Sequence, residues 1–194
     1  MKKIVFLINS LESGGAERVV SNLLNNLVEK YDCYLILIHN NIFYSIDDRV
    51  KIICLDEKKE LTGIMKLLRL PILAYKLSKI IKENRFEKVV SFLTRANYIN
   101  ILSNIFTKHK TIINIRSTMS RYKTEGLSGK INLFLIKSLF NKSDLIISNS
   151  LGVDNDLKTF YVCRKTLKKI DILKLEIFQK RMIMVEVLLE KNIN

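Results

Sequence analysis

Residues 4–27 read IVFLINSLESGGAERVVSNLLNNL, and this stretch decides the fold. Ile4 to Ile8 is a five-residue apolar run, which is typical of a strand buried on both faces of a parallel sheet. Ser10 to Gly15 is mostly polar and ends in two glycines, and apolar residues then recur at helical spacing from Ala16 to Leu27. The stretch therefore predicts a central strand, a glycine loop and a helix.

The glycine loop favours an anion as its ligand. Gly14 and Gly15 allow the backbone a positive φ and allow a bulky group to approach the main chain, while free N–H groups at the helix start attract negative charge. Glu17 suits the positive end of the helix dipole, and Arg18 adds a full positive charge nearby. The pair fits neither the GxGxxG nor the GxxxxGK[ST] pattern, so a tight turn without a ligand is the alternative.

Composition and charge limit the class of protein. With 194 residues, 48% hydrophobic and 27% charged, the chain suffices for one well-buried α/β domain. No stretch approaches the roughly 20 apolar residues of a membrane span, and the apolar run after Lys3 lacks a signal-peptide cleavage site, so we expect a cytoplasmic chain. The net charge of +14 favours anionic partners, namely nucleic acid, phospholipid head groups or nucleotide-linked substrates.

Strand and helix patterns alternate along the rest of the chain. The expected strands are Cys33–His39, Val50–Leu55, Lys88–Leu93, Thr111–Ile115 and Asp144–Asn149. The expected helices are Gly63–Asn84, Tyr98–Phe106, Ile131–Phe140 and Leu151–Tyr161. Pro71 either kinks the first of these helices or opens a second one, and Ser117–Gly129 is expected to be a polar loop. The order predicts an α/β fold with a Rossmann-like, doubly wound parallel sheet.

Ligands of such sheets bind beyond the carboxyl ends of the strands, where the topology switches. The segments at these ends are Ser10–Gly15, Thr94–Asn97, Arg116–Ser120 and Asn149–Gly152. The sequence Asp154-Asn155-Asp156 imitates a DxD metal motif, but its place at the start of a short helix favours helix capping. His39 and His109 are too far apart in the sequence to indicate a metal site, so each is expected at a strand end or in a loop.

A basic amphipathic segment runs from Lys58 to Lys88, where nine basic residues accompany three glutamates. Five of the basic residues lie largely on one side of the expected helix: Lys66, Arg69, Lys76, Lys79 and Lys82. Apolar residues from Leu68 to Ile80 form the opposite stripe, which is expected to face the core. The basic side indicates contact with an anionic membrane surface, and a merely solvated helix face is the alternative.

Three segments carry a resemblance to a known family: SLESGGAERVVSNLL at 10–24, SFLTRANYINIL at 91–102 and INLFLIKSLFNKSDLIISNS at 131–150. They resemble the N-terminal half of a family 4 glycosyltransferase of the GT-B type over residues 1–162. In particular, they resemble bacterial enzymes that add N-acetylgalactosamine, from a UDP donor, to an undecaprenyl-diphosphate-linked glycan for protein N-glycosylation.

The resemblance implies a Rossmann-like domain that binds the acceptor of a retaining hexosyltransferase. It implies that Gly14 and Gly15 lie against the donor diphosphate, and that Arg95, Asn97 and Arg116 face the acceptor or its diphosphate. Guanidinium groups suit that role because they make bidentate contacts with phosphate oxygens. It implies a UDP-sugar as substrate, no metal or other cofactor, a lipid-linked glycan as partner, and a place on the inner face of the cell membrane.

The chain departs from the family beyond residue 162. Residues 163–194 match nothing in the family, no glutamate pair has its E-x7-E spacing, and no catalytic residue can be assigned. We therefore expect a glycosyltransferase-like domain at 1–162 and an unrelated tail at 163–194 from a truncated or frameshifted gene, inactive alone. A genuine single-domain protein is the alternative history.

A different function class also fits the positive charge. A basic Rossmann-like module could bind nucleic acid or another anion without catalysis. The sequence has no RRM, KH or helix-turn-helix signature and few aromatic residues among its basic ones, so no nucleic-acid partner is expected.

Overall fold

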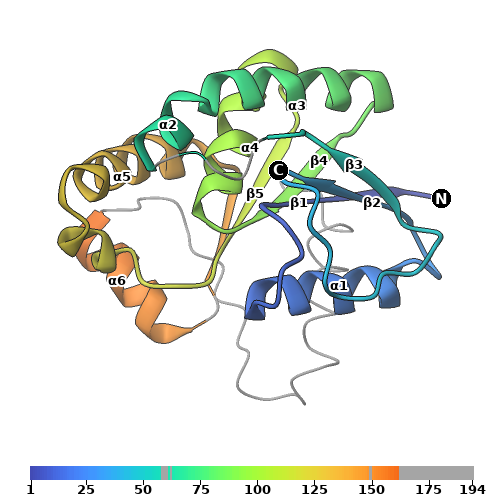
Figure 1. The fold of residues 1–194 in the computed structure, drawn as a ribbon, viewed down its shortest axis with the longest axis horizontal. Coiled ribbons are helices and arrows are strands. Elements are labelled where there is room, and N and C mark those ends of the chain that lie inside the picture. Colours follow the sequence, from blue (N-terminus) through green and yellow to red (C-terminus); the bar gives the residue numbers. More distant parts are fainter. Residues whose placement is uncertain (58–60, 62, 149, 162–194) are drawn as a thin grey trace.

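A computed structural model describes residues 1–57, 61, 63–148 and 150–161, which form a parallel sheet with helices on both faces (Figure 1). The strands are β1 (Lys3–Ile8), β2 (Asp32–Leu37), β3 (Lys51–Cys54), β4 (Lys88–Phe92), β5 (Lys110–Ile115) and β6 (Leu145–Ser148). Their order is β3-β2-β1-β4-β5-β6, and every neighbouring pair is parallel. This confirms the predicted Rossmann-like, doubly wound sheet. The predicted tail at 163–194 lies outside the described residues.

Strand β1 lies in the middle of the sheet and is buried on both faces. Successive side chains of a strand point to opposite faces, so an unbroken apolar run supplies two cores at once. Ile4, Phe6 and Ile8 belong to the core on one face, and Val5 and Leu7 belong to the core on the other.

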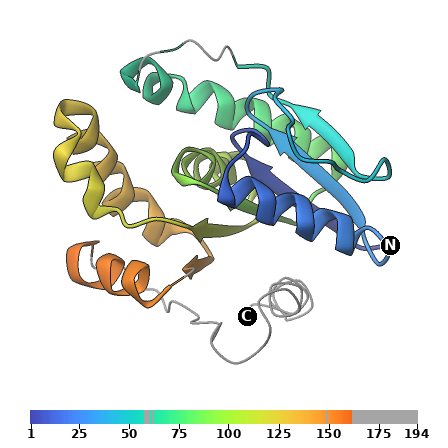
Figure 2. The same ribbon diagram turned by 60° about the horizontal axis from the view of Figure 1, so that its bottom comes forward.

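The helices divide between these two faces. Their bounds are α1 (Gly15–Leu27), α2 (Gly63–Leu68), α3 (Leu70–Asn84), α4 (Thr94–Thr107), α5 (Gly126–Leu139) and α6 (Leu151–Tyr161), with short 3-10 turns η1 (Ser120–Thr124) and η2 (Phe140–Lys142). Apolar residues of α3, α4, α5 and α6 join the core that contains Val5 and Leu7. Helix α1 packs into the opposite core, and Figure 2 brings it to the front of the sheet.

Pro71 opens a second helix and does not kink a long one. Helix α2 ends at Leu68, and α3 begins at Leu70 with Pro71 in its first turn. A proline is well tolerated there because the first N–H groups of a helix have no partner within the helix.

The break between α2 and α3 corrects the expected apolar stripe. Leu73 and Leu77 are buried as expected, but the side chains of Leu68 and Ile72 are 66% and 53% exposed. Leu68 belongs to α2 and not to α3, and Ile72 directly precedes the buried Leu73 in α3, so it points about 100° away from that residue around the helix axis. Leu68 and Ile72 therefore lie on the surface and not in the core.

The segment Ser117–Gly129 is more regular than a polar loop. It contains η1 and the first turn of α5. Met119 and Tyr122 are buried, and the carboxylate of Asp156 accepts hydrogen bonds from the main-chain N–H groups of Met119 (2.7 Å) and Ser120 (3.2 Å). Contacts with a distant helix thus order a segment whose local sequence looks polar.

A buried polar network ties the end of α4 to β4. His109 lies between α4 and β5, as expected for a loop histidine, and its Nε2 is 2.8 Å from Asn100 Oδ1. Asn100 Nδ2 donates to the Val89 carbonyl (3.0 Å) and to Ser91 Oγ (3.0 Å). Burial lowers the pKa of His109 to about 4, and the nearby Asp144 offsets part of this effect. The folded protein therefore holds a neutral imidazole at neutral pH.

This histidine predicts loss of stability in mild acid. The folded pKa lies below the unfolded value, so the neutral form stabilises the fold above about pH 6.5. That contribution declines as the pH falls from about 6.5 towards 4, by about 3 kcal/mol in all. Urea unfolding between pH 7.5 and 4.5 should show the decline, and His109→Gln should show a flatter profile. Parallel profiles for the two proteins would contradict the prediction.

Candidate functional site

A cleft of about 520 Å³ lies at the carboxyl edge of the sheet. It is lined by residues that follow β1, β4 and β5, by the first turns of α1 and α4, and by η1. The lining residues are Asn9, Gly15, Ala16, Glu17, Leu93, Thr94, Arg95, Asn97, Asn114, Ile115, Arg116, Ser117, Met119, Arg121 and Tyr122. Strands β2 and β4 flank β1 on opposite sides, so the cleft lies at the topological switch point, where ligands of such sheets bind.

Of the two loop glycines, Gly15 is among the residues that line the cleft. Gly14 is extended (φ −104°, ψ 165°) and Gly15 begins α1, so neither residue uses the positive φ that glycine allows. A Cβ at Gly15 would meet no atom within 4 Å, whereas a Cβ at Gly14 would collide with the carboxylate of Glu17. The Glu17 side chain therefore folds back over the start of α1, and the space beside Gly15 is open for a ligand.

The loop after β2 holds the glycine loop in place. The main chain of Leu11 donates to the Asn41 carbonyl (2.8 Å) and accepts from the Phe43 N–H (2.9 Å). The hydroxyl of Tyr44 donates to the Gly14 carbonyl (3.1 Å). No local pattern in the sequence identifies these contacts, because the two loops are separated by about thirty positions.

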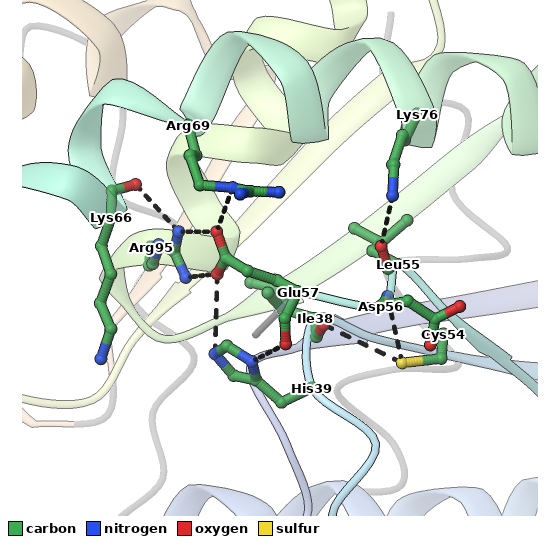
Figure 3. Close-up of polar contacts among 10 residues, drawn as sticks. All are labelled: Ile38, His39, Cys54, Leu55, Asp56, Glu57, Lys66, Arg69, Lys76 and Arg95. Atoms are coloured by element: carbon green, nitrogen blue, oxygen red, sulfur yellow. Dashed lines mark hydrogen bonds and ion pairs between the residues drawn. The ribbon is translucent and has the colours of Figure 1, made fainter. Parts of the chain in front are cut away.

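Arg95 lies on the cleft wall, but most of its guanidinium is engaged inside the protein. Both terminal nitrogens donate to the carboxylate of Glu57, one of them at 2.7 Å, and Nη2 also donates to the Lys66 carbonyl (2.9 Å) (Figure 3). The Glu57 side chain is fully buried. Its carboxylate also lies 3.3 Å from Arg69 Nε and 3.7 Å from His39 Nε2. Three basic side chains therefore lie around one buried carboxylate.

Asn97 lies in the first turn of α4, which begins at Thr94 and not, as expected, at Tyr98. It is buried, accepts a hydrogen bond from Ser91 Oγ (2.8 Å) and donates to the Asn114 carbonyl (3.2 Å). Asn97 therefore joins α4 to β4 and β5 from beneath the cleft.

Arg116 and Arg121 bring positive charge to the cleft. Arg116 follows β5 directly and is half-buried, and Arg121 lies in η1 and is exposed. The Arg121 guanidinium lies 5.0 Å from the centre of the Tyr122 ring, and its Nη2 donates to the Tyr122 hydroxyl (3.2 Å). Sequence reasoning missed Arg121 and Tyr122 because their segment was expected to be a loop without a fixed position.

Leu93, in the lining of the cleft, has a strained backbone conformation. This residue precedes α4 and has φ 72° and ψ 149°, a backbone conformation that residues other than glycine rarely adopt. Such residues cluster at functional sites, since the surrounding structure must hold them there at a cost of about 1–3 kcal/mol.

The five basic residues predicted for membrane contact fall into two groups. Arg69 turns towards Glu57, and Lys76 Nζ donates to the Leu55 carbonyl (3.0 Å). Lys79 and Lys82 are exposed on α3, and Lys66 is half-buried at the end of α2. The basic side of this segment is therefore partly used to fix the chain after β3.

Asp154 and Asp156 do not cap the start of α6, which corrects that expectation. Ser150 takes this role, because its Oγ accepts the Val153 N–H (3.3 Å). Asp154 pairs with Lys158 (2.8 Å), and Asp156 holds the chain before η1. Within the described part of the chain, no group of three or more His, Cys, Asp or Glu side chains could hold a metal ion.

Comparisons with known proteins give sequence relatives, whereas no protein-family profile matches. The chain is 38% identical over 159 residues to a Campylobacter jejuni N-acetylgalactosamine-N,N'-diacetylbacillosaminyl-diphospho-undecaprenol 4-alpha-N-acetylgalactosaminyltransferase. The aligned region covers 81% of this chain and 44% of that enzyme. It is 32% identical over 124 residues to a second enzyme of that species, the GalNAc-alpha-(1->4)-GalNAc-alpha-(1->3)-diNAcBac-PP-undecaprenol alpha-1,4-N-acetyl-D-galactosaminyltransferase, covering 63% of this chain and 34% of that enzyme.

Solved structures match the fold. The structure of HepE from Anabaena, in complex with UDP and glucose, matches with a TM-score of 0.56 at 14% sequence identity. The match covers 82% of this chain and 41% of the HepE chain. Sucrose-phosphate synthase from Thermosynechococcus elongatus has a TM-score of 0.67 at 10% identity, covering 83% of this chain and 45% of its own.

The sheet order and the cleft at its switch point define the class, which is a Rossmann-like, doubly wound domain, the fold that these solved structures share. Within this class, the chain is a homologue of the two N-acetylgalactosaminyltransferases of C. jejuni. The resemblance expected from the three quoted segments is thereby confirmed. The matched region spans less than half of the length of each of these relatives.

The Glu57 cluster predicts a large effect of a small substitution. Glu57→Gln keeps the size of the side chain but leaves Arg95 without a counter-charge in a buried place. Removing one partner of a buried ion pair destabilises a protein by about 3 kcal/mol or more. Urea unfolding at pH 7 should show this loss. Glu29→Gln is the matched control, because Glu29 pairs with Arg49 on the exposed surface, and it should change the midpoint little. Equal midpoints for both variants would contradict the prediction.

Proposed function

We propose that the chain forms the acceptor-binding half of a retaining hexosyltransferase. The enzyme would transfer a hexose or N-acetylhexosamine from a UDP-sugar to a lipid-diphosphate-linked glycan. The observation that carries the proposal is the cleft at the switch point, lined by the glycine loop and by Arg116, in a homologue of two undecaprenol-linked glycan transferases.

The lining supplies suitable chemistry for a diphosphate. Arg116 and Arg121 offer planar, permanently charged donors that match phosphate oxygens. Gly15 lets the donor diphosphate approach the main chain at the start of α1, where the helix dipole favours negative charge. Fixed donors of this kind stabilise a leaving diphosphate without a metal ion, so the proposal includes none.

Binding of the lipid-linked acceptor tests the proposal. We would titrate the chain with a short-chain prenyl-diphosphate glycan that ends in N-acetylgalactosamine and follow the heat of binding. Wild-type protein should bind it, and Arg116→Gln should weaken binding about tenfold, since a hydrogen bond to a charged group contributes about 1.5–3 kcal/mol. Arg49→Gln, an equal loss of charge outside the cleft lining, is the control. No wild-type binding, or equal weakening by both variants, would refute the proposal.

Turnover is a separate readout of the same experiment. Transfer needs the donor sugar fixed beside the acceptor hydroxyl, and such positioning supplies about 7–11 kcal/mol at best. One Rossmann-like wall fixes only one of the two substrates, so we expect binding without steady transfer when UDP-N-acetylgalactosamine is added. Multiple-turnover product, detected by mass spectrometry, would show that this chain suffices for catalysis.

The proposal places this domain on the inner face of the cell membrane, where a lipid-linked acceptor resides. In the residues that the structure covers, no helix is both long and apolar enough to span a bilayer. Helices α2 and α3 instead carry an exposed apolar surface made of Ile64, Met65, Leu68, Ile72 and Tyr75. We call this the α2–α3 surface.

Charge beside the α2–α3 surface favours an anionic bilayer as its occupant. Lys79 Nζ lies 4.9 Å from the centre of the Tyr75 ring, and Tyr75 packs edge-on against the partly exposed Phe106. Along the chain, Lys66 in α2 precedes Tyr75, and Lys82 in α3 follows it. Apolar side chains interleaved with lysines suit the boundary between lipid head groups and acyl chains.

Liposome sedimentation tests this part of the proposal. Wild-type protein should sediment with anionic vesicles at low salt, and the triple change Lys66→Gln, Lys79→Gln and Lys82→Gln should weaken the association by about 1 kcal/mol per residue. Arg69 and Lys76 are left intact because they hold internal contacts. The triple change Lys2→Gln, Lys108→Gln and Lys142→Gln removes the same charge from other exposed positions. Equal loss for the two triple variants would leave only a general effect of charge and would refute a specific surface.

A further inference from the structure

Two buried amide oxygens in the cleft have no hydrogen-bond partner. They are Oδ1 of Asn9, just after β1, and Oδ1 of Asn114, near the end of β5, and among the described residues nothing donates to either. Both residues line the cleft, and Asn114 is 1% exposed. Burying a polar atom without a partner is unfavourable, so a ligand that donates hydrogen bonds would relieve both atoms.

The main chain holds both residues firmly. The Asn9 carbonyl accepts hydrogen bonds from the N–H groups of Ile38 (3.1 Å) and His39 (2.8 Å). The Asn114 carbonyl accepts one from Asn97 Nδ2 (3.2 Å), and Asn114 itself is paired with Phe92 in the sheet. The backbone of Asn9 is therefore tied to the end of β2, and the backbone of Asn114 is fixed within β5.

The internal contacts of Arg95 and Asn97 leave a particular set of polar atoms for a ligand. Asn97 uses its amide within the protein, and the terminal nitrogens of Arg95 serve Glu57 and Lys66. Among the buried side-chain atoms of the cleft lining, three have no partner in the described chain: the acceptors Asn9 Oδ1 and Asn114 Oδ1 and the donor Arg95 Nε.

This set of atoms suits a neutral sugar and not a phosphate. A phosphodiester oxygen has no hydrogen to donate at neutral pH, so it cannot satisfy an amide oxygen. A sugar hydroxyl donates one hydrogen bond and accepts others, and an acetamido N–H donates one. Both kinds of group can therefore pair with Asn9 and Asn114, and a hydroxyl oxygen can also accept from Arg95 Nε.

We propose that Asn9 and Asn114 bind the hydroxyl or acetamido groups of the terminal acceptor sugar, while the diphosphate of the acceptor contacts Arg116 and Arg121. This inference rests on the proposed function, which it deepens by assigning separate residues to the sugar and to the diphosphate. Asn9 and Asn114 then determine specificity for the sugar, and they do not contribute to diphosphate affinity.

The test is a pair of NMR titrations of the full chain, one with methyl α-N-acetylgalactosaminide and one with inorganic pyrophosphate. The wild-type protein should bind the glycoside, with shifts of the side-chain amide signals of Asn9 and Asn114. Asn9→Leu and Asn114→Leu should each weaken glycoside binding at least about tenfold and leave pyrophosphate binding unchanged. Asn114→Asp, which keeps an acceptor oxygen, should retain the glycoside and weaken pyrophosphate.

The outcomes separate this inference from the proposed function. If the wild-type chain fails to bind the glycoside, or if the leucine variants bind it as tightly as wild type, the inference is wrong. Equal weakening of both probes by Asn114→Leu would also overturn it, because a merely structural residue would affect the whole cleft. The titration with the lipid-linked acceptor tests the proposed function independently. That ligand can bind through Arg116 and Arg121 even when Asn9 and Asn114 contribute nothing to its affinity.

Discussion

The structure depends on β1 being hydrogen-bonded to strands on both sides. The chain first winds outward through β2 and β3, and it then returns across β1 to build β4, β5 and β6 on the other side. Right-handed crossovers place the connecting helices on opposite faces, so the loops after β1 and β4 turn away from each other at the sheet edge. The cleft is the space that this divergence leaves, and the proposed sugar and diphosphate contacts lie in its walls.

Charge compensation inside the protein decides which walls can meet an anion. Glu57 is a fully buried carboxylate, and it pairs with Arg95 and lies beside Arg69 and His39. A buried charge is tolerated only when it is paired, so this cluster fixes the chain after β3 against α4 and neutralises a cation of the cleft wall. The overall charge of +14 therefore overstates the positive potential near Arg95, and Arg116 and Arg121 carry the proposed contact with a diphosphate.

The proposed functions occupy different parts of one domain. The cleft wall formed by Asn9 and Asn114 would take a neutral sugar, the arginines after β5 would take a diphosphate, and the α2–α3 surface would lie on the bilayer from which the lipid-linked acceptor comes. Helix α4 connects these parts. Its first turn lies in the cleft, and its residue Phe106 packs against Tyr75 of the α2–α3 surface.

The sequence by itself determined the fold class, a doubly wound parallel sheet, and the glycine loop after the first strand, because these follow from local periodicity and from the handedness of crossovers. Only the tertiary structure decided what Arg95 does. Glu57 is 38 residues away from it, and no local pattern identifies a partner at that separation. The same holds for Asn9 and Asn114. Their amide oxygens can be recognised as lacking a hydrogen-bond partner only after the hydrogen bonds of all their neighbours are known. Local residue patterns fix the elements, whereas burial and pairing between distant elements fix the chemistry of the site.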